Sequence, residues 1–236
     1  MKKLTTLLLL LVSIVSYSQE LTGNQLLEKA IKFHDPNGNW ETFKGELLVT
    51  METPKGTPRK STIKINLPEE YFYVKAVKGK NTTEYTVIKK NSKIEFNGKT
   101  PSEEEKKEHK LSFERANLYK NYYTYLYGLP MKLKDEGTII HQKIEKKKFK
   151  GKDYLVLKAS YNKEVGKDTW YFYFNPKTFA MEVYQFFKET KDSGEYILLS
   201  GLETINDVKM PKVRAWYYNK DNGYLGTDIL LSKKNK

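Results

Sequence analysis

The sequence predicts a mainly antiparallel β protein with about eleven strands in one large curved sheet and helices inserted at two places. Short runs of alternating apolar and polar residues, separated by turn residues, fill most of the chain. Helical spacing recurs at only two places, and one hairpin carries aromatic side chains on both faces. A sheet with that many strands must curl or close, so a hollow is expected on one side of it.

The aromatic hairpin spans residues 168–188 and turns at residues 175–178, where Asn and Pro favour a turn. Its first strand places rings on both faces: Trp170, Phe172 and Phe174 on one, Tyr171 and Tyr173 on the other. Because an antiparallel sheet usually exposes one face to water, we expect this hairpin to be covered on both faces. The hollow would then hold helices, a ligand, or both.

The N-terminus predicts a Sec signal peptide over residues 1–18. Lys2 and Lys3 precede an apolar run that ends at Val15, and Ser16 and Ser18 fit a cleavage site before residue 19. A retained membrane anchor is the alternative, but the apolar run is short for a bilayer. Residues 19–236 are expected to form a single domain, since no Pro/Ser-rich linker divides them. The protein would reside in the periplasm, with outer-membrane association or secretion as alternatives.

The first predicted helix opens the mature chain. Thr22, followed three residues later by Gln25, resembles a capping box, and apolar residues recur at helical spacing as far as Ile31. The helix should end before Pro36, because the residue before a proline is biased away from helical geometry. Alternation then predicts five strands, at residues 43–51, 63–67, 71–77, 85–88 and 94–96.

The second helical segment follows Pro101. Ser102 is the expected N-cap, with Glu105 at the third position, and the helical pattern continues to Gly128 with a break expected near Ser112. Its tyrosines form a stripe, and such a stripe is more often core packing than a ligand platform. The remaining strands are predicted at residues 139–149 and 154–161, in the aromatic hairpin, and at residues 195–204, 213–218 and 226–231.

Composition excludes several kinds of chemistry. The sequence contains no Cys, so disulfides, thiol chemistry and Cys-based zinc sites are excluded. The formal charge of +13 predicts a basic exterior, for which an anionic envelope surface is a suitable partner and plain solubility the alternative. Nucleic acid is not an expected partner outside the cytoplasm, and a monomer is expected.

Catalysis is not predicted. A nucleophile needs a base beside it, and the chain offers only His34, His109 and His141, without a Gly-x-Ser-x-Gly motif. Asp35, next to His34, is explained more simply as the cap of a turn. No spacing typical of metal ligands is present, so neither a metal nor a cofactor is expected. A lipid or glycan hydrolase that uses His34 and Asp35 remains an alternative.

Four stretches carry a resemblance. Residues 34–36 (HDP) with Trp40, residues 127–133 (YGLPMKL), 214–217 (RAWY) and 225–228 (LGTD) resemble a secreted, uncharacterised family of Bacteroidetes-type bacteria. The order of elements and the aromatic hairpin are similar to the LolA/LolB-like superfamily of periplasmic lipoprotein carriers. That resemblance implies an unclosed antiparallel β-barrel with helices on the concave side. The absence of Cys places the chain closer to the soluble carriers than to the anchored receptors.

The leading hypothesis is an exported, soluble protein that holds a hydrophobic ligand, either a lipid or the acyl chain of a lipoprotein, in the hollow of the sheet. The candidate lining residues are Trp40, Tyr122, Leu126, Trp170, Phe172 and Phe174. His34, Asp35 and Arg214 are the candidate polar groups at the rim, Arg214 because it lies in one of the four motifs. The alternative is a structural or partner-binding envelope protein whose helices fill the hollow.

Overall fold

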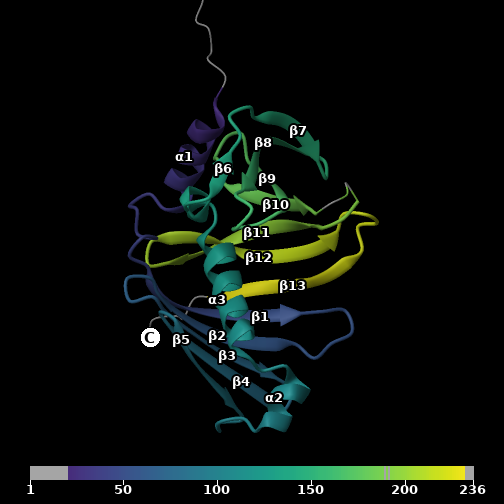
Figure 1. The fold of residues 1–236 in the computed structure, drawn as a ribbon. Helices are drawn as coiled ribbons and strands as arrows, with labels where there is room; N and C mark the ends of the chain where they lie inside the picture. Colours follow the sequence, from purple (N-terminus) through teal and green to yellow (C-terminus); the bar gives the residue numbers. More distant parts are fainter. Residues whose placement is uncertain (1–20, 189, 191, 232–236) are drawn as a thin grey trace, which may run out of the picture.

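One continuous antiparallel sheet of 13 strands organises the computed structural model, which describes residues 21–188, 190 and 192–231. The predicted signal peptide lies outside these residues. Neighbouring strands follow the order β5-β4-β3-β2-β1-β13-β12-β11-β10-β9-β8-β6, and β7 pairs with β8 (Figure 1). The two edges do not pair with each other in this order, so the barrel is unclosed, as expected.

The chain builds this sheet from two meanders separated by helices. The first meander contains β1 (Lys44–Glu52), β2 (Arg59–Asn66), β3 (Tyr71–Lys78), β4 (Asn81–Ile88) and β5 (Asn91–Phe96). The second contains β6 (Thr138–Ile140), β7 (Glu145–Phe149), β8 (Lys152–Tyr161), β9 (Thr169–Phe174), β10 (Met181–Phe187), β11 (Glu195–Ile205), β12 (Val208–Tyr218) and β13 (Tyr224–Leu231). The strand predicted at residues 139–149 is in fact two strands, β6 and β7.

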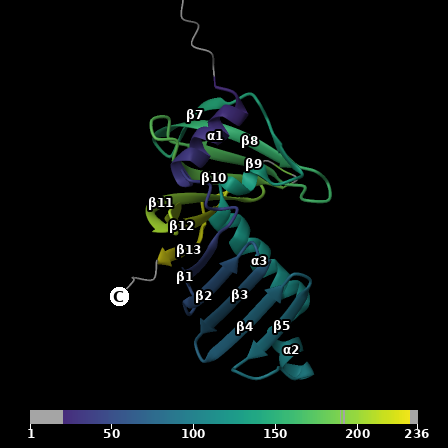
Figure 2. The ribbon, with the colours of Figure 1, turned by 90° about the vertical axis from the view of Figure 1, so that its left-hand side faces the viewer.

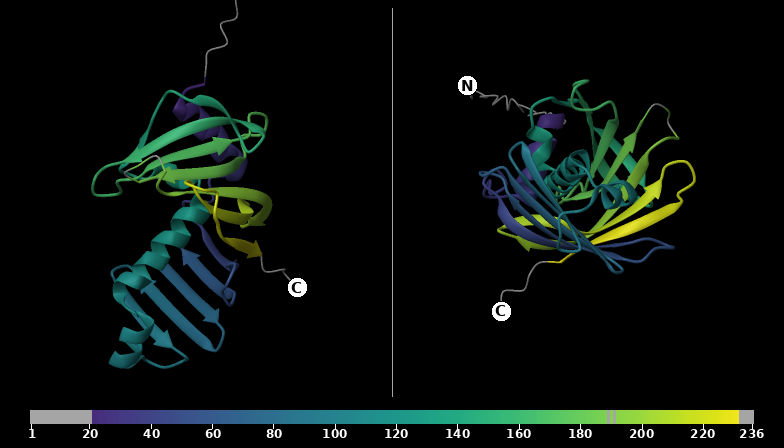
Figure 3. Two further views of the ribbon diagram at one scale, coloured as in Figure 1. Left: turned by 90° about the vertical axis from the view of Figure 1, so that its right-hand side faces the viewer. Right: turned by 60° about the horizontal axis from the view of Figure 1, so that its bottom comes forward.

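The first and last strands join the two meanders. β1 pairs with β13 from Leu48 opposite Leu231 to Glu52 opposite Thr227. Strands that lie about 180 residues apart in sequence therefore become neighbours at the centre of the sheet. Figure 2 shows the two meanders as the two ends of one bent sheet, and the right-hand view of Figure 3 shows that sheet wrapped around the helices.

The helices begin where the sequence places their caps. Thr22 and Gln25 form the capping box of α1 (Gly23–His34), and Ser102 and Glu105 form that of α2 (Glu103–His109). The expected break is present, because Lys110 adopts a left-handed conformation with φ of 52°. Ser112 then caps α3 (Phe113–Gly128).

Helix α3 lies in the hollow of the sheet, where it contacts strands of both meanders (Figures 1 and 3). Its buried residues include Ala116, Tyr123 and Tyr127. A single turn of 3-10 helix, η1 (Met131–Lys134), follows it. None of the helices in the described part of the chain has both the length and the apolar character needed to cross a bilayer.

The aromatic hairpin forms β9 and β10 and is covered on both faces, as predicted. Phe172 and Phe174 are fully buried in the main core on the concave side. Tyr173 is fully buried on the other face, where it packs with Tyr154. Strand β7 provides the cover there, because Phe149 lies 5.1 Å from Tyr173 between ring centroids.

Candidate ligand pocket beside helix α3

A pocket of about 840 Å³ opens between α3 and strands β9, β10 and β12, and we call it the α3 pocket. It is lined by Leu118, Asn121, Tyr122, Thr124, Tyr125, Leu126, Lys132, Asp135, Tyr161, Val165, Gly166, Lys167, Asp168, Trp170, Phe186, Lys188 and Trp216. The pocket volume lies in the range of ordinary small-molecule sites, roughly 300–1,000 Å³.

Aromatic rings form its walls. Trp170 stacks on Phe186 with ring centroids 4.8 Å apart, and Tyr125 meets Trp170 edge-on at 5.7 Å. Trp216 stacks on Tyr122 with centroids 6.2 Å apart. Phe186 lies directly opposite Trp170 in the β9–β10 register, which explains their contact. These rings remain partly exposed, so an apolar ligand would remove aromatic surface from water.

The spacing along α3 decides which side chains reach this pocket. Residues three or four apart share one face of a helix. Leu118, Tyr122 and Tyr125 accordingly line the pocket, whereas Ala116, Tyr123 and Tyr127 are buried against the sheet. The tyrosine stripe therefore has both of the roles that the sequence left open: Tyr123 and Tyr127 pack in the core, and Tyr122 and Tyr125 line a pocket.

The polar groups of the pocket are three lysines, two carboxylates, three phenols, the amide of Asn121 and the hydroxyl of Thr124. Lys132 is paired with Asp135 three residues later. Lys167 and Lys188 are exposed lining residues, and Asp168 lies among them. The hydroxyls of Tyr125 and Tyr161 bond each other. Burial raises the pKa of Tyr161 to about 12 and that of Tyr125 well above its usual value, so both phenols are neutral at physiological pH.

A buried polar centre lies beneath Tyr122. The Tyr122 hydroxyl donates to Asp228 Oδ2 at 2.9 Å, and burial raises the pKa of that carboxyl above its usual value. Arg214 lies directly opposite Asp228 in the β12–β13 register and is fully buried. Its guanidinium donates to the carbonyls of Pro211 at 2.7 Å and of Leu126 at 3.3 Å. This arginine fastens the end of α3 to the sheet.

The three polar residues expected at a rim lie inside the protein instead. His34 and Arg214 have no exposed surface, and Asp35 is 4% exposed. Asp35 Oδ1 accepts the N–H of Asn39 at 2.8 Å, and Oδ2 accepts the N–H of Trp40 at 2.9 Å. This is the turn cap that the sequence offered as the simpler explanation of Asp35.

The six expected lining residues divide into two groups. Tyr122, Leu126 and Trp170 come together in the α3 pocket. Trp40, Phe172 and Phe174 are instead buried in the main core, with exposures of 5%, 0% and 0%. They lie where packing of the sheet against the helices leaves them no access to the pocket.

Sequence reasoning missed Tyr125, Phe186 and Trp216 as lining residues. Phe186 could not have been found by counting outward from the turn, because a β-bulge between Met181 and Val183 shifts the register that pairs it with Trp170. Trp216 could not have been found either, because it reaches the pocket through the pairing of β12 with β11 and β13. Among the residues that the structure describes, no group of three His, Asp or Glu side chains could hold a metal ion.

Sheet and site together define a class: an unclosed antiparallel β-barrel with helices on its concave side and an aromatic pocket beside one of them. The chain belongs to a family of unknown function (DUF6503), whose model matches residues 2–233. No curated protein matches the chain.

Three solved structures are distantly similar. A LolA superfamily protein from Nitrosomonas europaea is 11% identical, with 92% of this chain and 96% of that chain covered and a TM-score of 0.49. A DUF1329 family protein from Desulfovibrio piger is 10% identical over 88% and 90% of the two chains, with a TM-score of 0.48. A domain from Vibrio parahaemolyticus, described as that of a putative outer membrane lipoprotein-sorting protein, is 11% identical. The match covers 91% of this chain and 94% of that chain, with a TM-score of 0.48. With sequence identities and TM-scores this low, the three structures indicate nothing about the ligand of the present chain.

Proposed function

We propose that this protein binds an apolar ligand, a lipid or the acyl chain of a lipoprotein, in the α3 pocket. The aromatic walls of that pocket carry the proposal. Trp170, Phe186 and Trp216 approach from the sheet and Tyr122 and Tyr125 from α3, leaving a volume of about 840 Å³ between them. Aromatic surface of this kind is typical of sites for hydrophobic ligands.

The charges at the pocket favour an amphipathic ligand with an acidic head. Lys132 is neutralised by Asp135, whereas the exposed Lys167 and Lys188 add two further cations beside the single carboxylate of Asp168. A fatty acid or phospholipid can place its chain against the aromatic rings and its anionic head at these lysines. If the predicted signal peptide exports the protein to the cell envelope, it meets such ligands there.

Tryptophan fluorescence offers a direct test on the mature protein, residues 19–236. A brominated fatty acid should quench Trp170 and Trp216, which line the pocket, and spare Trp40, which is 5% exposed and buried in the core. A Trp40→Phe variant should therefore retain the quenching. A Trp170→Phe, Trp216→Phe double variant should lose it.

Blocking the pocket separates this site from general surface binding. Asn121 is an exposed lining residue of α3, and Asn117, one turn earlier, is exposed but does not line the pocket. Asn121→Phe should weaken fatty-acid binding by about tenfold, equivalent to roughly 1.4 kcal/mol, while Asn117→Phe leaves it unchanged. Equal affinity in the two variants, or the absence of both bound lipid on extraction and fatty-acid binding, would refute the proposal. A co-purifying protein partner in that case would favour the structural alternative.

A further inference from the structure

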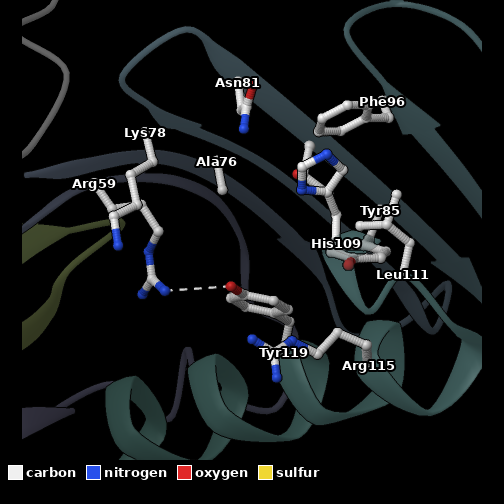
Figure 4. Close-up of a pocket in the computed structure, with 11 residues that line it drawn as sticks. Arg59, Ala76, Lys78, Asn81, Tyr85, Phe96, His109, Leu111, Arg115 and Tyr119 are labelled. Carbon is white, nitrogen blue, oxygen red and sulfur yellow. Dashed lines mark hydrogen bonds between the residues drawn. The ribbon is translucent and has the colours of Figure 1, made fainter. Parts of the chain in front are cut away.

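A second pocket, of about 240 Å³, lies beside the first half of α3, between the α2–α3 elbow and strands β2 to β5 (Figure 4). We call it the Arg59 pocket. It is lined by Arg59, Ala76, Lys78, Asn81, Thr83, Tyr85, Phe96, His109, Leu111, Arg115 and Tyr119. Its volume is below the usual range for drug-sized ligands, roughly 300–1,000 Å³, so it suits a small group.

Positive charge converges on this pocket. Arg59 lies directly opposite Lys78 in the β2–β3 register, Arg115 approaches from α3, and His109 approaches from α2. Like charges directly opposite each other on neighbouring strands destabilise a sheet. None of the lining residues is acidic. The facing charges of Arg59 and Lys78 therefore leave an unfavourable repulsion that an anion in the pocket would relieve.

Nearby carboxylates do not neutralise the pocket. Glu108 lies 3.8 Å from His109 but is itself exposed. Asp228 attracts Arg59 electrostatically but makes no salt bridge with it, and the Oδ2 atom of Asp228 accepts the hydrogen bond of Tyr122. The guanidinium of Arg59 and that of Arg115 make no salt bridge with a carboxylate of the described residues.

Arg59 is held in place by neutral groups. Its Nη1 donates to the hydroxyl of Tyr119 at 3.2 Å, drawn as a dashed line in Figure 4, and its Nη2 donates to that of Tyr123 at 3.3 Å. Its Nε is buried and has no hydrogen-bond partner among the described residues. The Arg59 guanidinium is thus held in one orientation, keeps one donor without a partner and forms no salt bridge. These features suit an oxyanion, since planar Arg donors match carboxylate and phosphate oxygens.

Neutral donors and aromatic rings complete the pocket. Asn81 and Thr83 contribute an amide and a hydroxyl from β4. Tyr119 stacks on Tyr85 with centroids 5.5 Å apart, and the Arg59 and Arg115 guanidinium carbons lie 5.5 and 5.7 Å from the Tyr119 ring centroid. Both arginines therefore contact the ring of Tyr119. This contact restricts their side chains before an anion binds and so lowers the conformational entropy that binding would cost.

We propose that the Arg59 pocket binds a small oxyanion of the phosphate class, either free phosphate or the phosphate group of a lipid head. Two arginines and a lysine supply the charge, and Asn81 and Thr83 supply neutral hydrogen bonds. The site is distinct from the α3 pocket, because the two pockets share no lining residue. Phosphate binding here does not depend on the α3 pocket holding a ligand.

Calorimetric titration of the mature protein with inorganic phosphate, at constant ionic strength, tests the proposal. Arg115 is exposed and its guanidinium makes no hydrogen bond to a described residue, so Arg115→Gln should fold normally and weaken phosphate binding by about tenfold. Lys60→Gln is the matched control. It removes one exposed positive charge beside Arg59, where alternation directs the side chain to the other face of β2, and should leave the affinity unchanged. Arg59→Gln should abolish binding.

Short-chain phosphatidic acid distinguishes the two sources of phosphate. Equal affinities for it and for inorganic phosphate would identify the free anion as sufficient, whereas tighter, phosphate-competitive binding would identify a lipid head. Asn121→Phe should leave phosphate binding intact even if it removes fatty-acid binding. The proposal is overturned if phosphate does not bind, or if Arg115→Gln and Lys60→Gln bind it equally well.

Discussion

The imidazole Nε2 of His34 accepts the backbone N–H of Met181 at 3.0 Å. The other ring nitrogen, Nδ1, lies 2.7 Å from the carbonyl oxygen of Lys209 and donates to it. These two bonds require the neutral ring with its proton on Nδ1. The last residue of α1 thereby fastens the helix to β12 and to the start of β10, and the histidine acts as a structural link between elements far apart in sequence.

Protonation of His34 should destabilise the fold. Burial, with the positive charges of Arg214 and Lys209, lowers the pKa of His34 from 6.5 to about 4. Above pH 6.5 the ring is neutral in both states and its contribution is fully present. As the pH falls from 6.5 to 4, the unfolded chain takes up a proton that the folded chain does not, so the free energy of unfolding should fall by roughly 3 kcal/mol.

Urea unfolding at pH 7 and at pH 5 measures the part of this loss that falls above pH 5, roughly 2 kcal/mol. Carboxylates also titrate in acid, so the comparison is with His34→Gln, whose pH dependence should be shallower than that of the natural protein. His141→Gln serves as the control, because His141 is half-buried and bonds Ser160 at 3.1 Å near the edge of the sheet. Identical pH slopes in the natural protein and His34→Gln would contradict the assignment.

Loss of the Asp35 carboxylate should unfold the turn that leads into Trp40. Asp35→Ala leaves the amides of Asn39 and Trp40 without their acceptors, and we expect a loss of roughly 2–4 kcal/mol in the free energy of unfolding. Asp35→Asn retains one acceptor and should lose less. Asp221→Ala removes a similar but exposed cap, of Gly223, and should cost under about 1 kcal/mol. An unchanged denaturation midpoint in Asp35→Ala would argue against this role.

Substitution of Gly128 should displace Trp40. A Cβ at Gly128 would overlap the indole of Trp40 and lie 2.6 Å from the Lys132 side chain. Gly128→Ala should therefore destabilise the protein by roughly 1–3 kcal/mol and alter the fluorescence of the buried tryptophan. Gly166→Ala is the control, since its Cβ would have its nearest neighbour, in Tyr161, at an ordinary 3.8 Å. Equal stability of the two variants would rule out a tight contact at Gly128.

Export should remove residues 1–18. Intact-mass measurement of the protein recovered from the cell envelope should give the mass of a chain that begins at Gln19. Substitution of Ser16 and Ser18 by bulky residues should slow this cleavage, because the peptidase requires small residues there. A recovered chain that still carries the apolar run would indicate a retained anchor.

Much of the architecture could be predicted because its causes are local. The capping pair of Thr22 with Gln25 and the break before Ser112 depend on residues a few positions apart, and the structure has both. The rings on both faces of the hairpin correctly predicted cover on both sides, with Tyr173 beneath β7. Alternation and turn chemistry act over one or two residues, so they can be read without knowledge of the partners.

The division between core and pocket could not be predicted from the same pattern. Phe174 and Trp170 occupy equivalent alternating positions on β9, yet only Trp170 remains partly exposed, because α3 leaves the pocket open on its side of the sheet. His34 was expected at the rim of the hollow, but it is buried and links α1 to β10 and β12. Each outcome depends on where the curved sheet meets a helix, which local alternation does not encode.

The residues themselves thus determined the strands, the helix caps and the antiparallel class, since backbone hydrogen bonding and side-chain alternation act between near neighbours. Tertiary structure alone decided which side chains meet across the hollow. Arg59 and Arg115 are 56 positions apart and each has the pattern of an ordinary solvated charge, but curvature of the sheet and docking of α3 bring both to one pocket. Contacts between distant segments depend on the topology of the whole sheet, and these contacts define both pockets.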